Sequence, residues 1–549
     1  MSDALKLAEL LFPDVTLLPE DMEKRYPERQ LKEGARVTRL APSPTGFLHF
    51  GNLFTGTVAY RTAKVTDGIF FVRVEDTDQK RKVEGAVEVM LGGLEAFGVV
   101  ADEGVVGEDI EKGDYGPYYQ SQRKEIYHVF AKSLVKQDLA YPCFCSAEEL
   151  DEIRAAQENE SVKGYWGEYA KCRKLTLEEI EANLKAGKPW TLRLKSPGDL
   201  TKKCFFDDMI KGKIEMPENV QDVVLLKSDG IPTYHFAHAV DDHLMRTTHV
   251  VRGDEWISSC PIHLQLFRVL GFKPPKFAHV APIMKEEDGN KRKLSKRKDP
   301  EAAVTYYIEK GYPKESVNEY ILTLANSNFE DWRKANPRES QDAFPFNLKK
   351  MSVSGALFDM TKFNDVSKNV ISLMSAKQVY DYTCQWAEQY DKDFFALISR
   401  DEEYSVNILN IDRETPKPRK DIASFSEIKD YVSYFFDEIY EKNYEMPENI
   451  TKAMAKEILE AYINEYNPDD DKQQWFDRIK ALCEPLGYTP NVKEYKKNPD
   501  AFKGHVGDVS TVIRLAVTGR RNTPDLYAIM SLLGEDKVKE RLSDAISNM

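Results

Sequence analysis

Cysteine is scarce in this chain: seven of its 549 residues are cysteines, an odd and scattered set. Such a set does not form a disulfide framework, and it fits a reducing cytoplasm. The sequence also has no apolar stretch long enough to span a bilayer, no internal repeat and no extended low-complexity tract. Residues 1–9 carry Asp3 and Glu9 without a long apolar run, so we expect no signal peptide and no membrane association.

The formal net charge of −14 argues against a general nucleic-acid-binding protein, because phosphate contacts need local cations. The acidity mainly serves solubility. Local basic clusters decide binding, and the run from Lys291 to Lys298 is one of them. Hydrophobic residues make up 42%, enough for buried cores, and the length predicts three to five domains.

The stretch from Arg39 to Asn52 reads Arg-Leu-Ala-Pro-Ser-Pro-Thr-Gly-Phe-Leu-His-Phe-Gly-Asn. It predicts a short strand over residues 37–41, a turn at its prolines and glycine, and a helix over residues 49–64. A nucleotide phosphate binds to such a helix start, where backbone N–H groups and the positive end of the helix dipole meet. His49 would lie at the helix entrance, able to donate to a phosphate oxygen.

A basic run lies far downstream, Lys293-Leu-Ser-Lys-Arg297 within residues 290–298. Asp288-Gly289 precedes it and Asp299-Pro300 follows, which predicts an exposed, mobile loop. A cationic loop opposite a phosphate-binding helix would stabilise a pentavalent phosphate transition state and its pyrophosphate leaving group.

Together the two stretches resemble the two signatures of class I aminoacyl-tRNA synthetases, and their flanks resemble bacterial glutamyl-tRNA synthetases. Val74-Glu-Asp-Thr-Asp78 and Val240-Asp-Asp-His-Leu-Met245 resemble further motifs of that family. The glutaminyl branch usually has Pro-Glu-Pro-Asn-Gly where this chain has Pro42-Ser-Pro-Thr-Gly46, which favours the glutamyl branch. The resemblance runs from about residue 36 to about residue 300 and continues more weakly to the C-terminus.

The resemblance implies an α/β fold, with a Rossmann-type catalytic domain, an inserted acceptor-binding domain and an all-α anticodon-binding region. Alternating strands and helices agree, and Ile69–Val74 is apolar enough for a strand buried on both faces of a parallel sheet. The expected divisions are an N-terminal extension at 1–35, the two catalytic halves at 36–125 and 221–285, the insertion at 126–220, the cationic loop and stem-contact region at 286–375, and the helical region at 376–549.

The resemblance assigns catalysis and ATP binding to two clusters of residues. Catalytic roles fall to His49, Gly51, Asn52, Lys293 and Lys296, and ATP binding to His49, Gly51, Ser295 and Lys296. Asn52 stands where the family has its second histidine, although an amide can still donate to a phosphate oxygen. The alternatives are a helix-capping role for His49 and a solvated basic loop for the lysines.

A glutamate pocket needs fixed cations, because the side chain of the substrate is anionic, and the planar fork of arginine binds carboxylates bidentately. The alternative for any single arginine is a surface ion pair. His238 stands where some relatives carry asparagine, and its protonation would make glutamate binding pH-dependent. The resemblance places in this pocket Arg39, Ala41, Ser43, Glu75, Tyr234, His238 and Arg252.

Two groups of residues raise the question of a metal. Asp241-Asp242-His243 resembles a metal cluster, but we favour hydrogen bonds that tie strand ends together, with Mg²⁺ arriving on the phosphates of ATP. Some relatives bind zinc through Cys-x-Cys and a later Cys-x-His, whereas Cys143 and Cys145 are followed here by Cys172-Arg-Lys174 without histidine. Structural zinc takes four ligands, and even with Tyr169 as a candidate we expect three reduced thiols and no zinc.

The implied activity is that of a glutamate–tRNA ligase, which activates L-glutamate with ATP and transfers it to the 3′ end of tRNA-Glu. A non-discriminating enzyme that also charges tRNA-Gln, and a catalytically inactive tRNA-binding scaffold, remain alternatives. We expect a cytoplasmic monomer. For tRNA contacts the candidates in the helical region are Arg514, Arg520, Arg521, Lys417, Arg419 and Lys420, each of which has a solvated surface position as its alternative.

Overall fold

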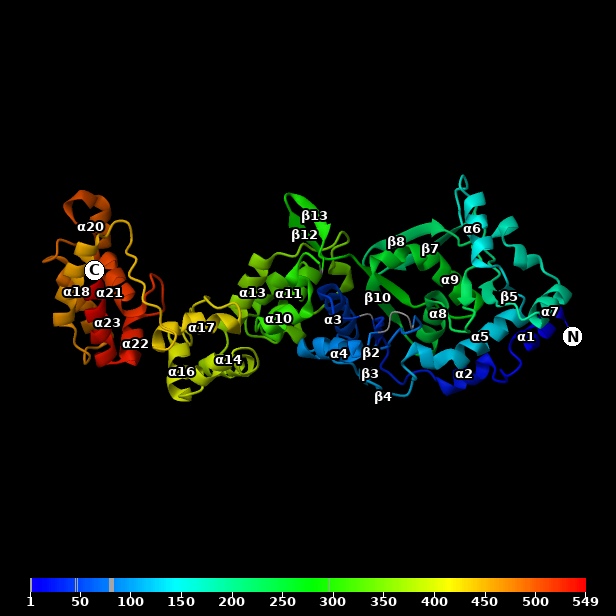
Figure 1. Cartoon of the computed structure of the whole chain (residues 1–549), viewed down its shortest axis with the longest axis horizontal. Coiled ribbons are helices and arrows are strands. Elements are labelled where there is room, and N and C mark those ends of the chain that lie inside the picture. The colour runs from blue at the N-terminus through cyan, green and yellow to red at the C-terminus, as the bar shows by residue number, and fades with distance from the viewer. Residues whose placement is uncertain (1, 45, 47, 79–82, 296) are drawn as a thin grey trace. The chain divides into compact units, whose positions relative to one another are not determined.

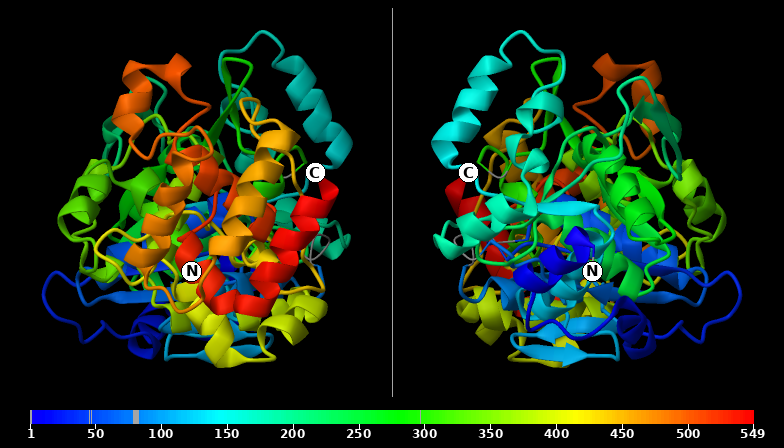
Figure 2. Two further views of the ribbon diagram at one scale, coloured as in Figure 1. Left: turned by 90° about the vertical axis from the view of Figure 1, so that its left-hand side faces the viewer. Right: turned by 90° about the vertical axis from the view of Figure 1, so that its right-hand side faces the viewer.

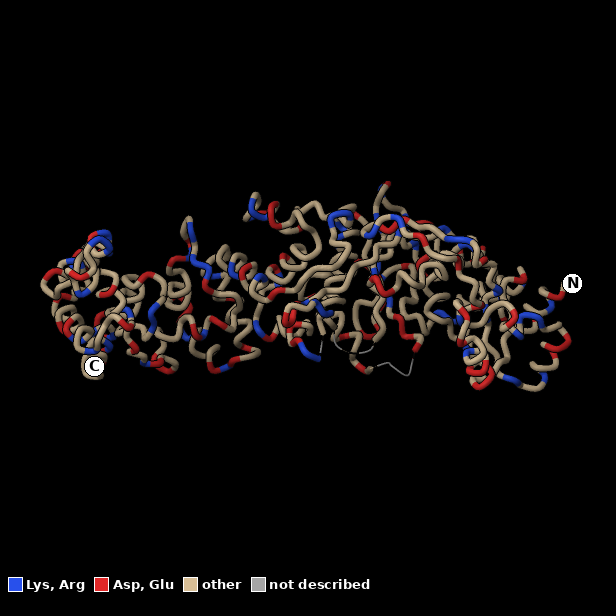
Figure 3. The backbone as a smooth tube through the Cα atoms, turned by 90° about the horizontal axis from the view of Figure 1, so that it is seen from above, with Lys and Arg blue, Asp and Glu red and all other residues tan. Residues whose placement is uncertain are grey.

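The computed structural model describes residues 2–44, 46, 48–78, 83–295 and 297–549 (Figure 1). The chain divides into two compact units, Met1–Tyr307 with Val317–Asp359, and Ile308–Ser316 with Met360–Met549. Among the helices of the described residues, none combines the length and the apolar character needed to cross a bilayer. Lys and Arg are interspersed with Asp and Glu along both units (Figure 3).

Two parallel ladders form the centre of the first unit. In one, β1 (Val37–Leu40), β2 (Ile69–Val72) and β3 (Glu103–Gly107) run parallel, and β4 (Ile110–Lys112) is antiparallel at the edge. In the other, β10 (His249–Gly253) and β11 (Lys276–Val280) run parallel, followed by β7 (Lys203–Asp208) and β8 (Gly212–Pro217).

The two ladders adjoin at β1 and β10. The carbonyl of Val37 accepts from the N–H of Thr248 at 3.0 Å, and the N–H of Val37 donates to the Thr248 hydroxyl at 2.8 Å. The strand order therefore reads β3-β2-β1 on one side and β10-β11 on the other. This reversal between β1 and β10 is a topological switch point, where open α/β sheets bind their ligands at the carboxyl ends of the strands.

Helix α3 (Phe50–Lys64) follows β1 through the Pro-Ser-Pro turn and begins after His49. Its apolar residues pack beneath the sheet, and Leu53, Val58 and Ala59 are buried. Further helices of this unit are α1 (Asp3–Leu11), α2 (Pro19–Arg25), α4 (Ala86–Ala96), α5 (Lys124–Lys136), α8 (Tyr234–Leu244), α9 (Cys260–Val269), α10 (Val304–Glu309), α11 (Lys314–Ala325) and α12 (Phe329–Ala335), and both α10 and α11 include residues of the second unit.

The segment between α5 and α8 interrupts the parallel pattern. It forms an antiparallel sheet of β5 (Ala140–Cys143), β6 (Thr191–Leu194) and β9 (Val224–Leu226). Capping boxes at Ser146 and Thr176 start α6 (Ala147–Ala156) and α7 (Leu177–Lys185). The same segment supplies β7, which pairs with β11, so it contributes directly to the sheet that carries the cavity.

The second unit contains helices and no strand within the residues that the structure describes. One core is formed by side chains such as Val379, Phe394 and Ile428, and another by side chains such as Ile458, Ile479 and Val512. The C-terminal helices, coloured orange and red, face the viewer in the left view of Figure 2. The helices are α13 (Met360–Ser372), α14 (Ala376–Tyr390), α15 (Lys392–Ile398), α16 (Glu402–Asn410), α17 (Ile428–Tyr431), α18 (Lys452–Glu465), α19 (Lys472–Cys483), α20 (Val492–Lys497), α21 (Val506–Thr518), α22 (Leu526–Leu533) and α23 (Glu535–Asn548).

Candidate active site

A cavity of about 520 Å³ opens at the carboxyl ends of β1, β2, β10 and β11. Its volume is within the range of small-molecule sites. The end of each strand and the chain that follows it form the wall: residues 39–43 at β1, Glu75 after β2, residues 251–253, 255 and 256 at β10, and residues 280–283 at β11. Most of the residues that the sequence predicts for ATP and glutamate therefore meet at the switch point.

His49 caps α3 and lines the cavity. Its Nδ1 accepts from the N–H of Gly51 at 2.9 Å, which leaves the ring proton on Nε2. The capping role that the sequence offered as an alternative is thus real, and it fixes the tautomer that donates. Gly51 and Asn52 also line the cavity. A Cβ on Gly51 would lie 3.2 Å from His49 Nδ1, so the first turn has little room for a side chain there.

The sequence predicts a mobile loop for the whole basic run, and the structure contradicts this prediction for its first half. Its first half is β13 (Asn290–Lys293), which pairs with β12 (Met284–Glu287), and the Asp288-Gly289 turn joins them in a hairpin. Arg292 forms ion pairs with Glu287 and Asp299, each at 2.6 Å. Arg292 lies opposite Lys285 in the hairpin, and Asp299 binds both cations, since Lys285 Nζ also donates to it at 3.1 Å.

Of the lysines predicted to act in catalysis, Lys293 at the end of β13 lines the cavity. The N–H of Ser295 donates to the buried carboxylate of Asp299 at 2.8 Å, so Ser295 is held by a group beyond the run. Lys296 lies outside the described residues.

Arg39 is almost fully buried at the end of β1. Its Nε and Nη2 donate to the two oxygens of Asp242 at 3.1 and 3.2 Å, a bidentate pair. Although burial opposes ionisation, Arg39 and Arg73 hold the pKa of Asp242 well below its usual range. Asp242 therefore already binds the two N–H groups with which Arg39 could hold a carboxylate. The sequence predicts that these groups are open to the substrate.

Sequence reasoning missed Arg73, which links two of these groups. Its Nη1 donates to Asp242 at 2.7 Å and its Nη2 donates to Glu75 at 3.1 Å. Burial raises the pKa of Glu75 in spite of the neighbouring Arg73 and Arg39. A charged residue inside the apolar run from Ile69 to Val74 was the available signal, because a buried charge must be paired.

Arg252, at the end of β10, lines the cavity and is 6% exposed. Within the described ranges no carboxylate forms an ion pair with it. Its Nη1 is buried and has no hydrogen-bond partner among the described residues. Arg252 therefore differs from Arg39 and Arg73, which both contact Asp242, in that no described carboxylate compensates its positive charge.

Tyr234, Ala41 and Ser43, which the resemblance assigns to the glutamate pocket, line the cavity wall. His238 does not reach it, because its ring is fully buried and stacks behind Tyr234 at a centroid distance of 5.9 Å. Burial lowers the pKa of His238 to about 3. The structure places His238 behind the cavity wall with a neutral ring near neutral pH, and a direct contact with glutamate stays a prediction.

Asp241, Asp242 and His243 belong to helix α8, not to strand ends. Asp241 accepts from Arg123 Nε at 2.7 Å and from the Tyr127 hydroxyl at 2.8 Å. His243 instead lies 2.6 Å from Glu23. The two carboxylates are counter-ions for buried arginines, so hydrogen bonding is the correct interpretation although its location differs.

The cysteines of the insertion form a close cluster. Ligand atoms of Cys143, Cys145 and Cys172 lie within 4.8 Å of one another, and the Sγ atoms of Cys145 and Cys172 are 3.6 Å apart. The hydroxyl of Tyr165 is 3.3 Å from Cys145 Sγ. Tyr169, the fourth donor that the sequence offered, donates to Glu160 instead, at 3.3 Å.

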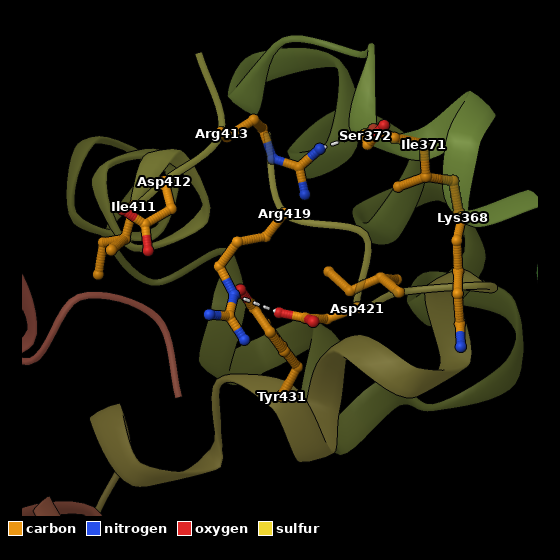
Figure 4. Close-up of a pocket in the computed structure, with 10 residues that line it drawn as sticks. Lys368, Ile371, Ser372, Ile411, Asp412, Arg413, Arg419, Asp421 and Tyr431 are labelled. Atoms are coloured by element: carbon orange, nitrogen blue, oxygen red, sulfur yellow. Dashed lines mark hydrogen bonds and ion pairs between the residues drawn. The ribbon is translucent and has the colours of Figure 1, made fainter. Parts of the chain in front are cut away.

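Most arginines proposed for tRNA contacts are bound within the helical unit. Arg514 donates to the carbonyl of Pro524 at 3.0 Å, Arg520 pairs with Asp430, and Arg521 donates to the carbonyl of Met446 at 3.0 Å. Arg419 pairs with Asp421 beside a small pocket that Arg413 and Tyr431 also line (Figure 4). Lys417 and Lys420 are exposed and have no ion pair in the described part of the chain.

The strand order, the cavity at its switch point and the His49-capped helix define a Rossmann-type domain with its ligand site at the carboxyl ends of the strands. Comparison with known proteins agrees. The family model for "tRNA synthetases class I (E and Q), catalytic domain" matches residues 36–365, and the model "Anticodon binding domain" matches residues 493–546. The chain belongs to the class I tRNA synthetase family of the E and Q type. The predicted family and fold class are thereby confirmed.

Two curated relatives are named glutamate–tRNA ligase. The one from Clostridium perfringens strain 13 is 51% identical over 541 residues, covering 98% of this chain and 99% of the relative. The one from Sorangium cellulosum is 46% identical over 566 residues, covering 97% and 99%. A solved glutamate tRNA ligase from Elizabethkingia meningosepticum, in complex with its amino acid, has a TM-score of 0.73 at 28% identity and covers 93% of this chain and 99% of its own.

Proposed function

We propose that this protein is a glutamate–tRNA ligase that activates L-glutamate with ATP and transfers it to the 3′ end of tRNA-Glu. The observation that carries the proposal is the cavity, because it is lined both by the first turn of α3 with His49 and by Arg252, which has no carboxylate partner among the described residues. The alternative of an inactive scaffold rests on Asn52 alone, and Asn52 lines the same cavity as His49.

In this mechanism the N-terminus of α3 and the Nε2–H of His49 bind the ATP phosphates, and Lys293 adds positive charge from β13. Negative charge grows on the phosphate oxygens as pyrophosphate leaves, so donors fixed in advance stabilise the transition state. We assign Lys296 and Ser295 to the same group of phosphate contacts. Mg²⁺ would arrive on the phosphates and neutralise part of their charge.

We propose that Arg252 binds the side-chain carboxylate of the substrate glutamate and that Glu75 binds its α-ammonium group. Arg39, Ala41, Ser43 and Tyr234 complete the pocket from β1 and α8. Burial raises the pKa of Tyr234, so its phenol keeps its proton and can donate. Catalysis is then a matter of positioning and electrostatics, without a covalent enzyme intermediate.

The proposal is tested by charging purified tRNA-Glu and tRNA-Gln with labelled glutamate. We expect ester-linked glutamate on tRNA-Glu, and charging of tRNA-Gln would identify a non-discriminating enzyme. An absence of acylation on both tRNAs would contradict the proposal. We further propose a cytoplasmic monomer, in keeping with seven cysteines that form no disulfide in the structure.

Lys417 and Lys420 are our candidates for tRNA backbone contacts in the helical region. We expect the double variant Lys417→Glu/Lys420→Glu to raise the tRNA KM by about tenfold and to lower the salt dependence of binding, since two phosphate contacts are lost. Lys392→Glu, the same charge change at an exposed residue of α15, should have little effect. Equal tRNA KM values for all three proteins would remove this surface from tRNA recognition.

The cysteine cluster changes our expectation about zinc, which rested on the lack of a fourth ligand. Four tetrahedral ligands at about 2.3 Å place sulfur atoms about 3.8 Å apart. The observed 3.6 Å between Cys145 and Cys172 fits, and Tyr165 supplies a fourth donor. We therefore propose that Cys143, Cys145, Cys172 and Tyr165 can hold zinc, which would brace the insertion.

Elemental analysis of protein purified without chelators should show about one zinc per chain. Cys172→Ser should lose it, whereas Cys204→Ser, which removes a buried thiol of β7 outside the cluster, should keep it. Well under one equivalent in the unmodified protein would return the cluster to three reduced thiols, as the sequence alone suggested.

A further inference from the structure

The five N–H groups of Arg252 can be accounted for one by one. Nε donates to His279 Nε2 at 3.0 Å. Nη2 faces His263 Nδ1 at 3.1 Å and Cys260 Sγ at 3.4 Å. The two N–H groups of Nη1 have no partner in the described structure. Within the described structure, these hydrogen bonds of the guanidinium thus go to uncharged imidazole and thiol groups and to no carboxylate.

The tautomer of His279 is set by Asp208 on β7. His279 Nδ1 lies 2.7 Å from Asp208 Oδ2, and Asp208 Oδ1 accepts from the N–H groups of Ile210 and Lys211 at 2.9 Å each. An ionised Asp208 can only accept, so His279 carries its proton on Nδ1 and offers the lone pair of Nε2 to Arg252. The carboxylate of Asp208 thus contacts the neutral ring of His279 and does not contact Arg252, whose own charge stays unmatched among the described residues.

His263 repeats this arrangement from α9. Because arginine can only donate, His263 Nδ1 must accept, and its proton lies on Nε2, 2.9 Å from His235 Nδ1. Burial lowers the pKa of both His263 and His235 and raises that of Cys260 to about 11. All three groups therefore stay neutral at physiological pH.

We call the groups that hold Arg252, namely His263, His279 and Cys260, the neutral cradle. A comparison with Arg39 shows what this cradle does. Arg39 lies on the same cavity wall, but Asp242 occupies its bidentate face. An arginine buried without a counter-ion is costly, and a carboxylate ligand would remove that cost on binding. A carboxylate next to Arg252 in the free protein would instead compete with the substrate.

We propose that His263, His279 and Asp208 are positioning residues for glutamate selection: they fix Arg252 through neutral acceptors, so that Nη1 keeps an uncompensated charge for the side-chain carboxylate of the substrate. This inference rests on the proposed function and adds residues that do not line the cavity. It also gives the insertion a part in amino-acid choice, because Asp208 belongs to β7.

The test compares two nearly isosteric variants of the full-length protein, His263→Asn and His263→Asp, which differ in the charge placed beside Arg252. Initial rates of tRNA-dependent ATP–pyrophosphate exchange give KM for glutamate and for ATP, and calorimetry with L-glutamate gives binding directly. We expect Asp to raise the glutamate KM at least about a hundredfold and Asn less than about tenfold, with the ATP KM unchanged in both. A parallel pair, His279→Gln and His279→Leu, keeps or removes the Nε2 acceptor, and Leu should be the more damaging.

Equal glutamate KM values for His263→Asp and His263→Asn would overturn the proposal, as would an ATP KM that rises as much as the glutamate KM. Calorimetry separates this inference from the proposed function. Glutamate binding that weakens in His263→Asp, in a protein without exchange activity, would support the cradle and contradict the ligase. If the unmodified protein binds no glutamate, both are wrong.

Discussion

Replacing Arg252 with glutamine should raise the glutamate KM by about a hundredfold or more and leave the ATP KM nearly unchanged. Arg252 is the arginine of the cavity wall without a carboxylate partner among the described residues, so the substrate carboxylate would lose its counter-charge. Loss of one partner from a buried charge pair costs about 2–5 kcal/mol, which corresponds to this range. Steady-state exchange kinetics with varied glutamate measure it.

Arg268→Gln is the matched control. Arg268 lies on α9, the helix that also carries His263, but its side chain is 63% exposed. It should leave both KM values close to those of the unmodified protein. A glutamate KM that is unchanged in Arg252→Gln would show that another cation, with Arg39 as the first candidate, reads the substrate side chain.

Two substitutions of His49 should distinguish its structural role from its chemical role. His49→Ala removes both the cap of α3 and the Nε2 donor, whereas His49→Asn restores a good N-cap without the imidazole. We expect kcat of activation to fall at least about tenfold in both variants, because a tenfold loss corresponds to about 1.4 kcal/mol of transition-state stabilisation. The thermal midpoint should fall further in His49→Ala, since the lost cap costs about 1 kcal/mol.

Steady-state ATP–pyrophosphate exchange rates and thermal unfolding of the same preparations measure these effects. If His49→Asn retained the full rate, His49 would serve only to cap the helix. The same outcome would shift the phosphate contacts to the backbone N–H groups of α3 and to Lys293.

Much of the fold could be predicted from local pattern. The apolar run at Ile69, the proline turn after Leu40 and the helix start at His49 each follow from short-range chemistry, and β2, β1 and α3 match them closely. The family motifs then located the cavity wall, including Arg252 and Tyr234.

The missed features depend on residues brought together by tertiary packing. Asp208 and His279 are 71 positions apart in the chain yet form one contact, and Arg39 meets Asp242 across 203 positions. No local pattern distinguishes an arginine paired with a buried aspartate from one left open for substrate. Likewise, the Asp288-Gly289 pair predicts a turn, but it does not predict the strand pairing that makes Asn290–Lys293 part of a hairpin.

The most direct test of the central claim is ATP–pyrophosphate exchange by the unmodified protein, with tRNA present and with glutamate or glutamine as the amino acid. The neutral cradle around an uncompensated Arg252 predicts rapid exchange with glutamate and at least about a hundredfold lower kcat/KM with glutamine, because the neutral amide cannot match the charge. Equal exchange with both amino acids, or none with glutamate, would contradict this account of the site.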